Sequence, residues 1–417
     1  MTVSRSEISE VFTPRRENVN KQMYIDRGVH ETNLYRSIKG SMHSFLFGES
    51  GSGKSWLYKK VFSEKGINYL IVNCANASRK SSITDEIYAK CFKAGTATKK
   101  SFKETKKAGA SMCFSAELAH EGQYEIHSED KLLQSYRHLY EKHSGQQTII
   151  ALDNIETIFG NQSLMDELSD ILILLDDSDY AEYRVKYLLV GVPNDVLQYF
   201  STTKTVSSVG NRINEIPKIN GLDSQQVLDF VKRGFINQLK ISISQTELKR
   251  ISRHIYTNTL GIPQRIHEYC ECLAYCIEDN NWNYNPTLLD ETDKNWVLSG
   301  LRESYIAIES HLNSDETSDG RRNQVIFALA RISTHQIDTQ KIGVVIAQDF
   351  PENAPESNSG IGQVLASLSK GEMPILKKIN KSSFYTFADP RHLMCIRVML
   401  FKDTETNRVK KKTFKIN

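Results

Sequence analysis

The sequence has 417 residues, and its 39% hydrophobic and 25% charged side chains are typical of a soluble protein with a sizeable core. The formal net charge is only +3, so a nucleic-acid partner would need a local basic patch. No apolar run approaches the roughly 18 residues of a membrane span, and residues 1–10 lack the apolar core of a signal peptide. The seven cysteines are dispersed and odd in number, which favours reduced thiols. We therefore expect a cytoplasmic protein without a membrane partner.

Residues 1–40 are a largely polar lead-in, and the first motif that carries chemistry follows them. Residues 48–55 read Gly-Glu-Ser-Gly-Ser-Gly-Lys-Ser, between the apolar run 45–47 and a segment compatible with a helix. This is a P-loop in its required context, and its backbone N–H groups are suited to the triphosphate of ATP. We expect Lys54 to reach the β- and γ-phosphates and Ser55 to coordinate Mg²⁺. The predicted nucleotide-binding residues are Gly48, Glu49, Ser50, Gly51, Ser52, Gly53, Lys54, Ser55 and Trp56.

Strand and helix patterns alternate after the P-loop. An apolar run covers 69–74 and a helical pattern covers 82–92, which favours an α/β sheet. Residues 93–127 interrupt this alternation with a lysine-rich segment and two short hairpin strands. Such a lysine run forms a solvated face or contacts nucleic acid or a partner protein, and both alternatives stay open.

The buried strand predicted at residues 148–153 ends in Asp153. This pattern is typical of a Walker B strand, which delivers a carboxylate to the edge of the sheet, where Asp153 would hold Mg²⁺ through water. The next residue is Asn154, at the position where many P-loop ATPases place a catalytic glutamate. Glu156 could orient the attacking water instead. If neither residue does so, hydrolysis would be slow and the protein would act as a switch.

Two polar residues further along the chain are candidates for sensing the nucleotide. Asn194 follows the strand predicted at 185–190, where it could sense the γ-phosphate or serve as a helix N-cap. Arg212 precedes a further strand and could reach the nucleotide of a neighbouring subunit. The alternative for Arg212 is a solvated loop.

Helical patterns replace the alternation from residue 222, at 224–234, 245–256 and 262–277, with another near 293–312. Residues 259–265 form a turn with proline at the start of a helix, and a lid domain could carry Arg265 over the nucleotide. In the same helix, His267 and three cysteines suggest a metal site or a set of buried thiols. Only part of this set shares one helix face, so we favour buried thiols.

The last hundred residues have a pattern of their own. Helical patterns at 321–332, 338–348 and 358–370 precede short strands at 375–379 and 384–387, which predicts a winged helix. Such a module binds double-stranded DNA or serves for packing. The exposed candidates on its third helix are Asn358, Ser359, Gln363, Ser367 and Lys370. Phosphate contacts could come from the wing and the basic tail, through Lys377, Lys378, Lys381, Arg408, Lys410, Lys411, Lys412 and Lys415.

This order of motifs resembles the AAA+ ATPases of the origin-recognition and transposition-regulator type, whose lids carry a Gly-x-Pro-Arg sensor. Residues 261–265 read Gly-Ile-Pro-Gln-Arg, so Arg265 falls one position late, and Asn154 replaces the second Walker B acid. The string 152–156, Leu-Asp-Asn-Ile-Glu, also looks like the Walker B of signal-transduction NTPases with numerous domains, the STAND class. The resemblance implies a P-loop domain, a helical lid and a winged helix in either case.

We therefore predict an α/β P-loop NTPase of the AAA+ class, a parallel sheet with a helical lid and a C-terminal winged helix. The expected segments are a lead-in (1–40), an ATPase domain (41–220), a lid (221–315), a winged helix (316–402) and a basic tail (403–417). The expected function is slow ATP hydrolysis that drives assembly or remodelling of a self-associating complex, on DNA through the winged helix. The alternative is a STAND-like switch that gates a partner effector protein without DNA.

Overall fold

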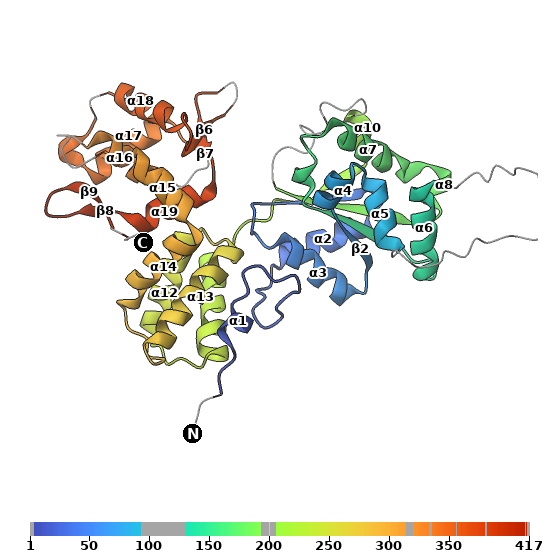
Figure 1. Cartoon of the computed structure of the whole chain (residues 1–417), viewed down its shortest axis with the longest axis horizontal. Coiled ribbons are helices and arrows are strands. Elements are labelled where there is room, and N and C mark those ends of the chain that lie inside the picture. The colour runs from blue at the N-terminus through green and yellow to red at the C-terminus, as the bar shows by residue number, and fades with distance from the viewer. Residues whose placement is uncertain are drawn as a thin grey trace, which may run out of the picture. The chain divides into compact units, whose positions relative to one another are not determined.

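The structure is a computed structural model that describes residues 4–92, 130–192, 200, 206–313, 320–332, 336–355, 357–379, 382–412 and 414. The lysine-rich insertion predicted at 93–127, Asn194, Lys381 and Lys415 lie outside these residues. The chain forms two compact units (Figure 1). The sheet unit consists of Arg27–Ser50 and Lys54–Ile219, and the helical unit of Met1–Asp26, Gly51–Gly53 and Asn220–Asn417.

The sheet unit is built on five parallel strands in the spatial order β2-β3-β4-β1-β5. The strands are β1 (His43–Phe47), β2 (Asn68–Asn73), β3 (Thr148–Asp153), β4 (Val185–Gly191) and β5 (Ile213–Glu215). The central strands β3 and β4 are near-continuous apolar runs, as expected of parallel strands with both faces covered. Because all strands run the same way, the residues that follow β1, β3 and β4 share one edge of the sheet.

Adjacent residues of the strands divide between two hydrophobic clusters, one on each face. Ile149 packs with residues of α2 and α3, whereas Ile150 packs with residues of α5, α6 and α7 (Figure 1). This alternation is what the pleat of a strand produces, and it fixes the register of the sheet. The described helices and turns of the unit are α2 (Val29–Lys39), α3 (Lys54–Lys65), α4 (Cys74–Lys80), α5 (Ile83–Cys91), α6 (Lys131–Lys142), η1 (Ile155–Thr157), α7 (Gln162–Ile173), η2 (Leu174–Asp176), α8 (Ser178–Ala181) and α10 (Val206–Gly210).

In the helical unit, capping residues in the sequence mark where helices begin. Asp223 and Gln226 form a capping box at the start of α11, and Pro263 occupies the first turn of α13. The expected helix at 224–234 ends as α11 at residue 231 and continues as a π-helical turn, and the expected helix near 293–312 is two helices. The elements are α1 (Ile8–Val11), α11 (Ser224–Val231), η3 (Lys232–Gln238), α12 (Gln245–Thr259), α13 (Pro263–Asp279), α14 (Leu288–Gly300) and α15 (Arg302–His311).

The beginning of the chain packs in the helical unit through Phe12. This side chain is fully buried, and its ring lies 5.2 Å from that of Phe235. A Cβ at Gly234, in the π-helical turn, would come within 2.5 Å of the Phe12 ring, so glycine is required there. The N–H of Thr13 donates to Nδ1 of the buried His267 at 3.0 Å. Residues up to Asp26 therefore belong with the helical unit, and the lead-in predicted at 1–40 is divided between the units.

The C-terminal part contains the three predicted helices and the predicted hairpin in the expected order. Its elements are α16 (Arg321–Leu329), α17 (Thr339–Asp349), η4 (Pro351–Asn353), α18 (Ser359–Leu368), β6 (Leu376–Lys378) and β7 (Tyr385–Phe387). Strands β6 and β7 are antiparallel, and Ile337 forms an isolated bridge with Tyr385. A further helix and a second hairpin follow, which we did not predict: α19 (Pro390–Met399), β8 (Leu400–Asp403) and β9 (Arg408–Lys411).

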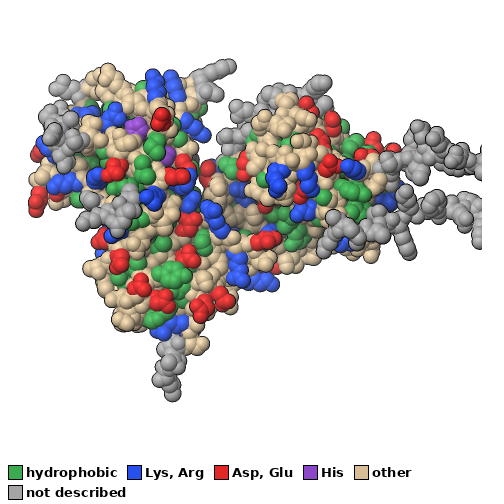
Figure 2. Space-filling view, in the orientation of Figure 1, with side chains coloured by type: hydrophobic (Ala, Val, Ile, Leu, Met, Phe, Trp, Pro, Cys, Tyr) green, Lys and Arg blue, Asp and Glu red, His purple; other side chains and the backbone are tan. Residues whose placement is uncertain are grey.

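The segment expected to be a basic tail (403–417) begins at the last residue of β8 and contains β9, and three of its lysines make ion pairs within the chain. Lys410 pairs with Asp403 at 2.7 Å, and Lys411 pairs with Glu309. Lys412 binds Asp290 at 2.8 Å and Asp293 at 3.2 Å. Figure 2 shows Lys and Arg side chains interspersed with Asp and Glu over the visible faces of both units, which agrees with the net charge of +3.

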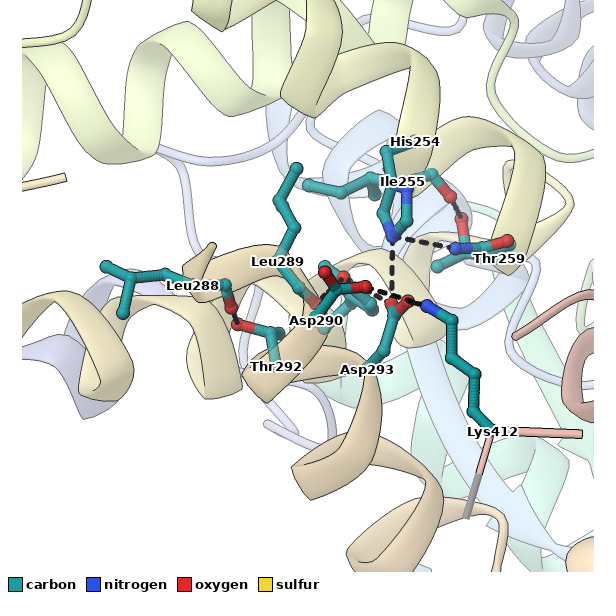
Figure 3. Close-up of polar contacts among 11 residues, drawn as sticks. His254, Ile255, Thr259, Leu288, Leu289, Asp290, Thr292, Asp293 and Lys412 are labelled. Carbon is teal, nitrogen blue, oxygen red and sulfur yellow. Dashed lines mark hydrogen bonds and ion pairs between the residues drawn. The ribbon is translucent and has the colours of Figure 1, made fainter. Parts of the chain in front are cut away.

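Asp293 of α14 is the centre of a buried polar network in the helical unit (Figure 3). It is only 1% exposed, and its carboxylate accepts hydrogen bonds from His254 Nε2 (2.8 Å), Tyr269 Oη (2.7 Å) and Lys412 Nζ (3.2 Å). These donors come from α12, α13 and the residue after β9. The network therefore connects the C-terminal segment to three helices that lie far from it in sequence.

The three cysteines of α13 are free thiols, and two of them are buried. Cys270 and Cys276 are buried, and burial raises the pKa of both thiols. Among the described residues, no group of three His, Cys, Asp or Glu side chains is arranged to hold a metal ion. This favours buried thiols over the metal alternative for this helix. Within the same described residues, none of the helices combines the length and the apolar character needed to cross a membrane.

Candidate nucleotide-binding site

The P-loop lies where the sequence predicts it, between β1 and α3. Gly51 has φ +79° and Gly53 has φ +89°, which are left-handed conformations that other residues rarely adopt. Lys54 is the first residue of α3, so the loop leads directly into a helix N-terminus. Backbone N–H groups at such a terminus have no partner within the helix and are suited to bind anions.

The ammonium of Lys54 is held by the loop itself. Its Nζ donates to the carbonyl oxygens of Gly48 at 2.8 Å and Glu49 at 3.0 Å. Burial lowers the pKa of the Lys54 ammonium from its ordinary value. Nearby carboxylates oppose that shift, in the order Glu156, Asp153 and Glu49. Because the pKa is lowered overall, these carboxylates do not fully compensate the buried charge, and a phosphate anion would add the missing compensation.

Asp153 ends β3, as predicted, and three donors fix its carboxylate. Ser55 Oγ and Tyr58 Oη both donate to Oδ2 of Asp153 at 3.0 Å. The N–H of Asn154 donates to Oδ1, also at 3.0 Å. The predicted metal ligands Ser55 and Asp153 are therefore in direct contact, although they lie 98 residues apart in sequence.

Glu156 lies in the turn η1, close after β3. Its Oε2 is buried and has no hydrogen-bond partner. A Cβ at Gly191 would come within 3.3 Å of this oxygen and 2.5 Å of the Ile155 side chain, so the Glu156 carboxylate lies against the end of β4. The side chain of Asn154 is exposed, and its Nδ2 donates to Oδ1 of Asn73 at 3.3 Å. The acid with a buried oxygen at this edge is thus Glu156, and the amide of Asn154 stands two residues before it.

The two candidate arginines are both engaged in ion pairs. Arg212 binds Asp176 at 2.7 Å, and Arg265 binds Glu268 at 2.7 Å. The carbonyl of Arg212 accepts from the N–H of His43, so Arg212 lies at the amino-terminal edge of the sheet. The P-loop follows the other end of β1, roughly 16 Å of strand away. The third sensor candidate, Asn194, lies outside the described residues.

Three polar residues of this region escaped the sequence analysis. Tyr58 contacts Asp153, Asn73 accepts from Asn154, and Lys218 forms an ion pair with Glu49 at 2.8 Å. Helical spacing could have indicated Tyr58, because residues three apart share a helix face and Tyr58 follows Ser55 by three. Asn73 and Lys218 contact residues that are distant in sequence, and no local pattern identifies them.

The residues present fit a nucleoside triphosphate with Mg²⁺. Ser55 and Asp153 offer hydroxyl and carboxylate oxygens, which are the ligands that Mg²⁺ prefers. The buried Oε2 of Glu156 has no hydrogen-bond partner, so it is available as an acceptor for a bound ligand or water. The positive φ angles of Gly51 and Gly53 are those of a loop whose successive N–H groups can converge on an anion. This is the donor set of a phosphoryl-transfer site.

Comparison with known proteins agrees with this geometry. Residues 37–200 match the family model described as an AAA domain. No curated protein matched the chain. Among solved structures, a Walker-type ATPase of Pyrococcus abyssi is similar at 17% identity and a TM-score of 0.50, over 93% of this chain and 99% of that one. The ORC2 protein of Aeropyrum pernix in its ADP form is similar at 14% identity and a TM-score of 0.50, over 94% of this chain and 96% of that one.

These likenesses concern the fold, since both identities are low. The structure of the chain itself also indicates a P-loop fold. The signs are its strand order, the P-loop after β1 and the acid at the end of β3. The predicted α/β P-loop fold is confirmed. Residues 37–200 match the model of an AAA domain, and the chain has an α/β P-loop fold similar to that of the Aeropyrum pernix ORC2 protein.

Proposed function

We propose that this protein binds ATP and Mg²⁺ at its P-loop, hydrolyses the ATP slowly, and uses the nucleotide state to control assembly of a complex. One observation carries the proposal. Lys54, Ser55 and Asp153 converge at the carboxyl edge of the sheet, beside a buried Glu156 oxygen that has no hydrogen-bond partner.

The side chains would divide the work of binding and charge neutralisation. Lys54 would exchange the carbonyls of Gly48 and Glu49 for phosphate oxygens. Ser55 and Asp153 would hold Mg²⁺, which supplies charge neutralisation and orientation of the phosphates when it is bound. In phosphoryl transfer most catalysis comes from positioning and electrostatic stabilisation, so these contacts supply most of what the reaction requires.

Glu156 is our candidate for orienting the attacking water. Its buried Oε2 is available as an acceptor, whereas the amide of Asn154 cannot act as a base. Glu156 lies two residues further along the chain than the glutamate of many P-loop ATPases. We therefore expect slow turnover.

The arginines link the proposal to self-association. Arg212 lies at the sheet edge opposite the P-loop, so it would serve the nucleotide of a neighbouring copy after releasing Asp176. Such an arginine stabilises negative charge in the transition state. Arg265 would act as a sensor by leaving Glu268 for a phosphate.

We assign the DNA-binding role to the C-terminal helices and the hairpin β6–β7 as a winged helix. Lys377 and Lys378 of β6 are exposed, as are Gln363 and Lys370 on or next to α18. Ser367 is instead bound by Arg322 at 2.7 Å. The paired lysines after residue 408 favour phosphate contacts from the wing over contacts from the tail. The cytoplasmic location stays a prediction.

A second candidate is a STAND-like switch that gates a partner effector protein and does not bind DNA. Two features favour it: an amide at position 154, and the Arg265 guanidinium held by Glu268. Both features suit a protein that holds ATP as a state and hydrolyses it little.

The test is the ATPase rate and the mass of the full chain at fixed ATP, with and without duplex DNA. Wild-type protein should turn over ATP slowly, and Lys54→Ala should not. DNA binding that requires ATP and weakens with salt would support the first function. If no DNA binds even at low salt, the STAND-like switch is the remaining candidate. Turnover equal to the wild type in Lys54→Ala would contradict the assignment of the nucleotide-binding site.

A further inference from the structure

We infer that Tyr58 is a positioning residue for metal binding, because its hydroxyl holds the Asp153 carboxylate against Ser55. The inference rests on the proposed function and assigns a role within the same site. It concerns a residue that the P-loop motif does not include, one turn into α3.

The geometry is specific to one oxygen of Asp153. Tyr58 is fully buried, and its Oη donates to Oδ2 of Asp153 at 3.0 Å. Ser55 Oγ donates to the same Oδ2, also at 3.0 Å. Residues three apart share one face of a helix, so both hydroxyls approach Asp153 from α3. The two donors together direct Oδ2 at the residue that is expected to ligate Mg²⁺.

The opposite side of the carboxylate is fixed as well. The N–H of Asn154 donates to Oδ1 at 3.0 Å. An ionised carboxylate only accepts hydrogen bonds, and the three donors together restrict its rotation. If the Tyr58 hydroxyl were removed, Oδ2 would keep Ser55 as its only donor among these three. Ser55 is also the group whose oxygen Mg²⁺ would engage, and Asp153 would then be less firmly oriented when the metal arrives.

The contribution of the Tyr58 hydroxyl can be tested separately from that of the ring. The Tyr58 ring packs against Phe62, with ring centroids 5.7 Å apart, and belongs to the core between α3 and the sheet. Tyr58→Phe keeps this packing and removes only the donor. Groups that orient a metal ligand typically contribute 10- to 100-fold in metal affinity, so the expected effect is measurable.

The experiment titrates Mg²⁺ into full-length protein with a fluorescent ATP analogue and follows analogue binding. Tyr58→Phe should raise the Mg²⁺ concentration at half-saturation by about 10- to 100-fold. Binding of the analogue in EDTA should be the same as in the wild type, because the P-loop contacts do not involve Tyr58. This second readout distinguishes metal positioning from a general disturbance of the site.

The matched control is Tyr136→Phe. Tyr136 is buried in the same unit, and its hydroxyl bonds that of Tyr187 at 2.7 Å, in the hydrophobic cluster on the other face of the sheet from Tyr58. Its Mg²⁺ dependence should equal that of the wild type, and thermal unfolding verifies that both variants are folded.

Each outcome decides the inference. An unchanged Mg²⁺ midpoint in Tyr58→Phe would overturn it while leaving the proposed function intact. Equal weakening with and without Mg²⁺ would assign Tyr58 to packing alone and overturn it as well. A wild-type protein that binds no nucleotide would overturn the proposed function together with the inference.

Discussion

Two carboxylates with buried oxygens, one in each unit, show how differently this chain uses the same chemical group. Asp293 of the helical unit accepts hydrogen bonds from His254 and Lys412 (Figure 3) and from Tyr269. Glu156 of the sheet unit has a buried oxygen with no partner. A satisfied buried network stabilises the fold, whereas an unsatisfied one costs stability unless a ligand or water completes it. At these two positions, the donors around Asp293 support the fold, whereas Glu156 keeps acceptor capacity that a ligand or water could use.

The electrostatics support the same distinction. Burial alone would raise the pKa of Asp293, but the hydrogen bond and charge of His254, followed by Lys412 and Tyr269, lower it below its ordinary value. The charged form is thus favoured by its surroundings in the folded state. At the P-loop, burial instead lowers the pKa of Lys54, which means that its charge is not fully compensated by the protein. Binding an anion there would supply the missing compensation.

The largest effect that the comparison predicts is on catalysis. Glu156→Gln should reduce ATP turnover by about 10²- to 10⁴-fold, because an amide cannot accept the proton of the attacking water. ATP should remain bound, and the free energy of unfolding should change little, since Oε2 makes no hydrogen bond in the fold. Single-turnover assays with labelled ATP measure the rate of hydrolysis and the amount of bound ATP. If Glu156→Gln turned over ATP at the wild-type rate, another residue would have to act as the base.

The second prediction concerns stability. Asp293→Ala should lower the free energy of unfolding by about 3–5 kcal/mol, because it leaves buried donors and a partly buried ammonium without their acceptor. Urea denaturation of the full chain measures the loss. The matched control is Asp290→Ala, which removes the other carboxylate bound to Lys412. The Asp290 side chain is 77% exposed, so the cost should stay within about 1 kcal/mol. Equal losses in the two variants would refute the structural role of Asp293.

The third and smallest prediction is a dependence of stability on pH. The pKa of His267 falls to about 3 through burial, and its Nδ1 accepts from Thr13 and must therefore be unprotonated. At pH values above the ordinary 6.5 the imidazole is neutral in both states, and its contribution to stability is fully present. Below that value the unfolded chain takes up a proton that the folded chain does not, so stability falls towards pH 3.

One such histidine contributes up to about 1.4 kcal/mol per pH unit. His267→Asn keeps a short acceptor at this place and should flatten the pH dependence of urea denaturation between pH 6 and pH 4. The control is His311→Asn, the same replacement at an imidazole bound to the Met373 carbonyl near the surface, against which the change in slope is compared. A slope in His267→Asn as steep as in the wild type would show that His267 titrates alike in both states.

Local signals made much of the sheet unit predictable. The glycine spacing of residues 48–55 and the apolar run that ends at Asp153 each describe a complete physical unit, a phosphate loop and a buried strand. The parallel arrangement of strands then requires both to reach the same edge. For this reason the contact between Ser55 and Asp153 could be anticipated without any knowledge of the chain between them.

The contacts that were missed connect distant parts of the chain. The fit of Phe12 against Gly234 depends on a π-helical turn, and no periodic pattern predicts it. Lys412 looked like part of a basic tail because its partners Asp290 and Asp293 lie about 120 residues earlier. Charge runs in a sequence give the sign of a segment but not the partner that neutralises it. The function of such a segment therefore required the structure.

The most direct test of the account is equilibrium binding of a fluorescent ATP analogue to the full chain, with and without Mg²⁺, in wild type and Lys54→Ala. The account predicts saturable binding that Mg²⁺ strengthens in the wild type, and loss of that binding in Lys54→Ala with the fold preserved. Binding of the same strength in Lys54→Ala, or no binding by a folded wild type, would contradict it.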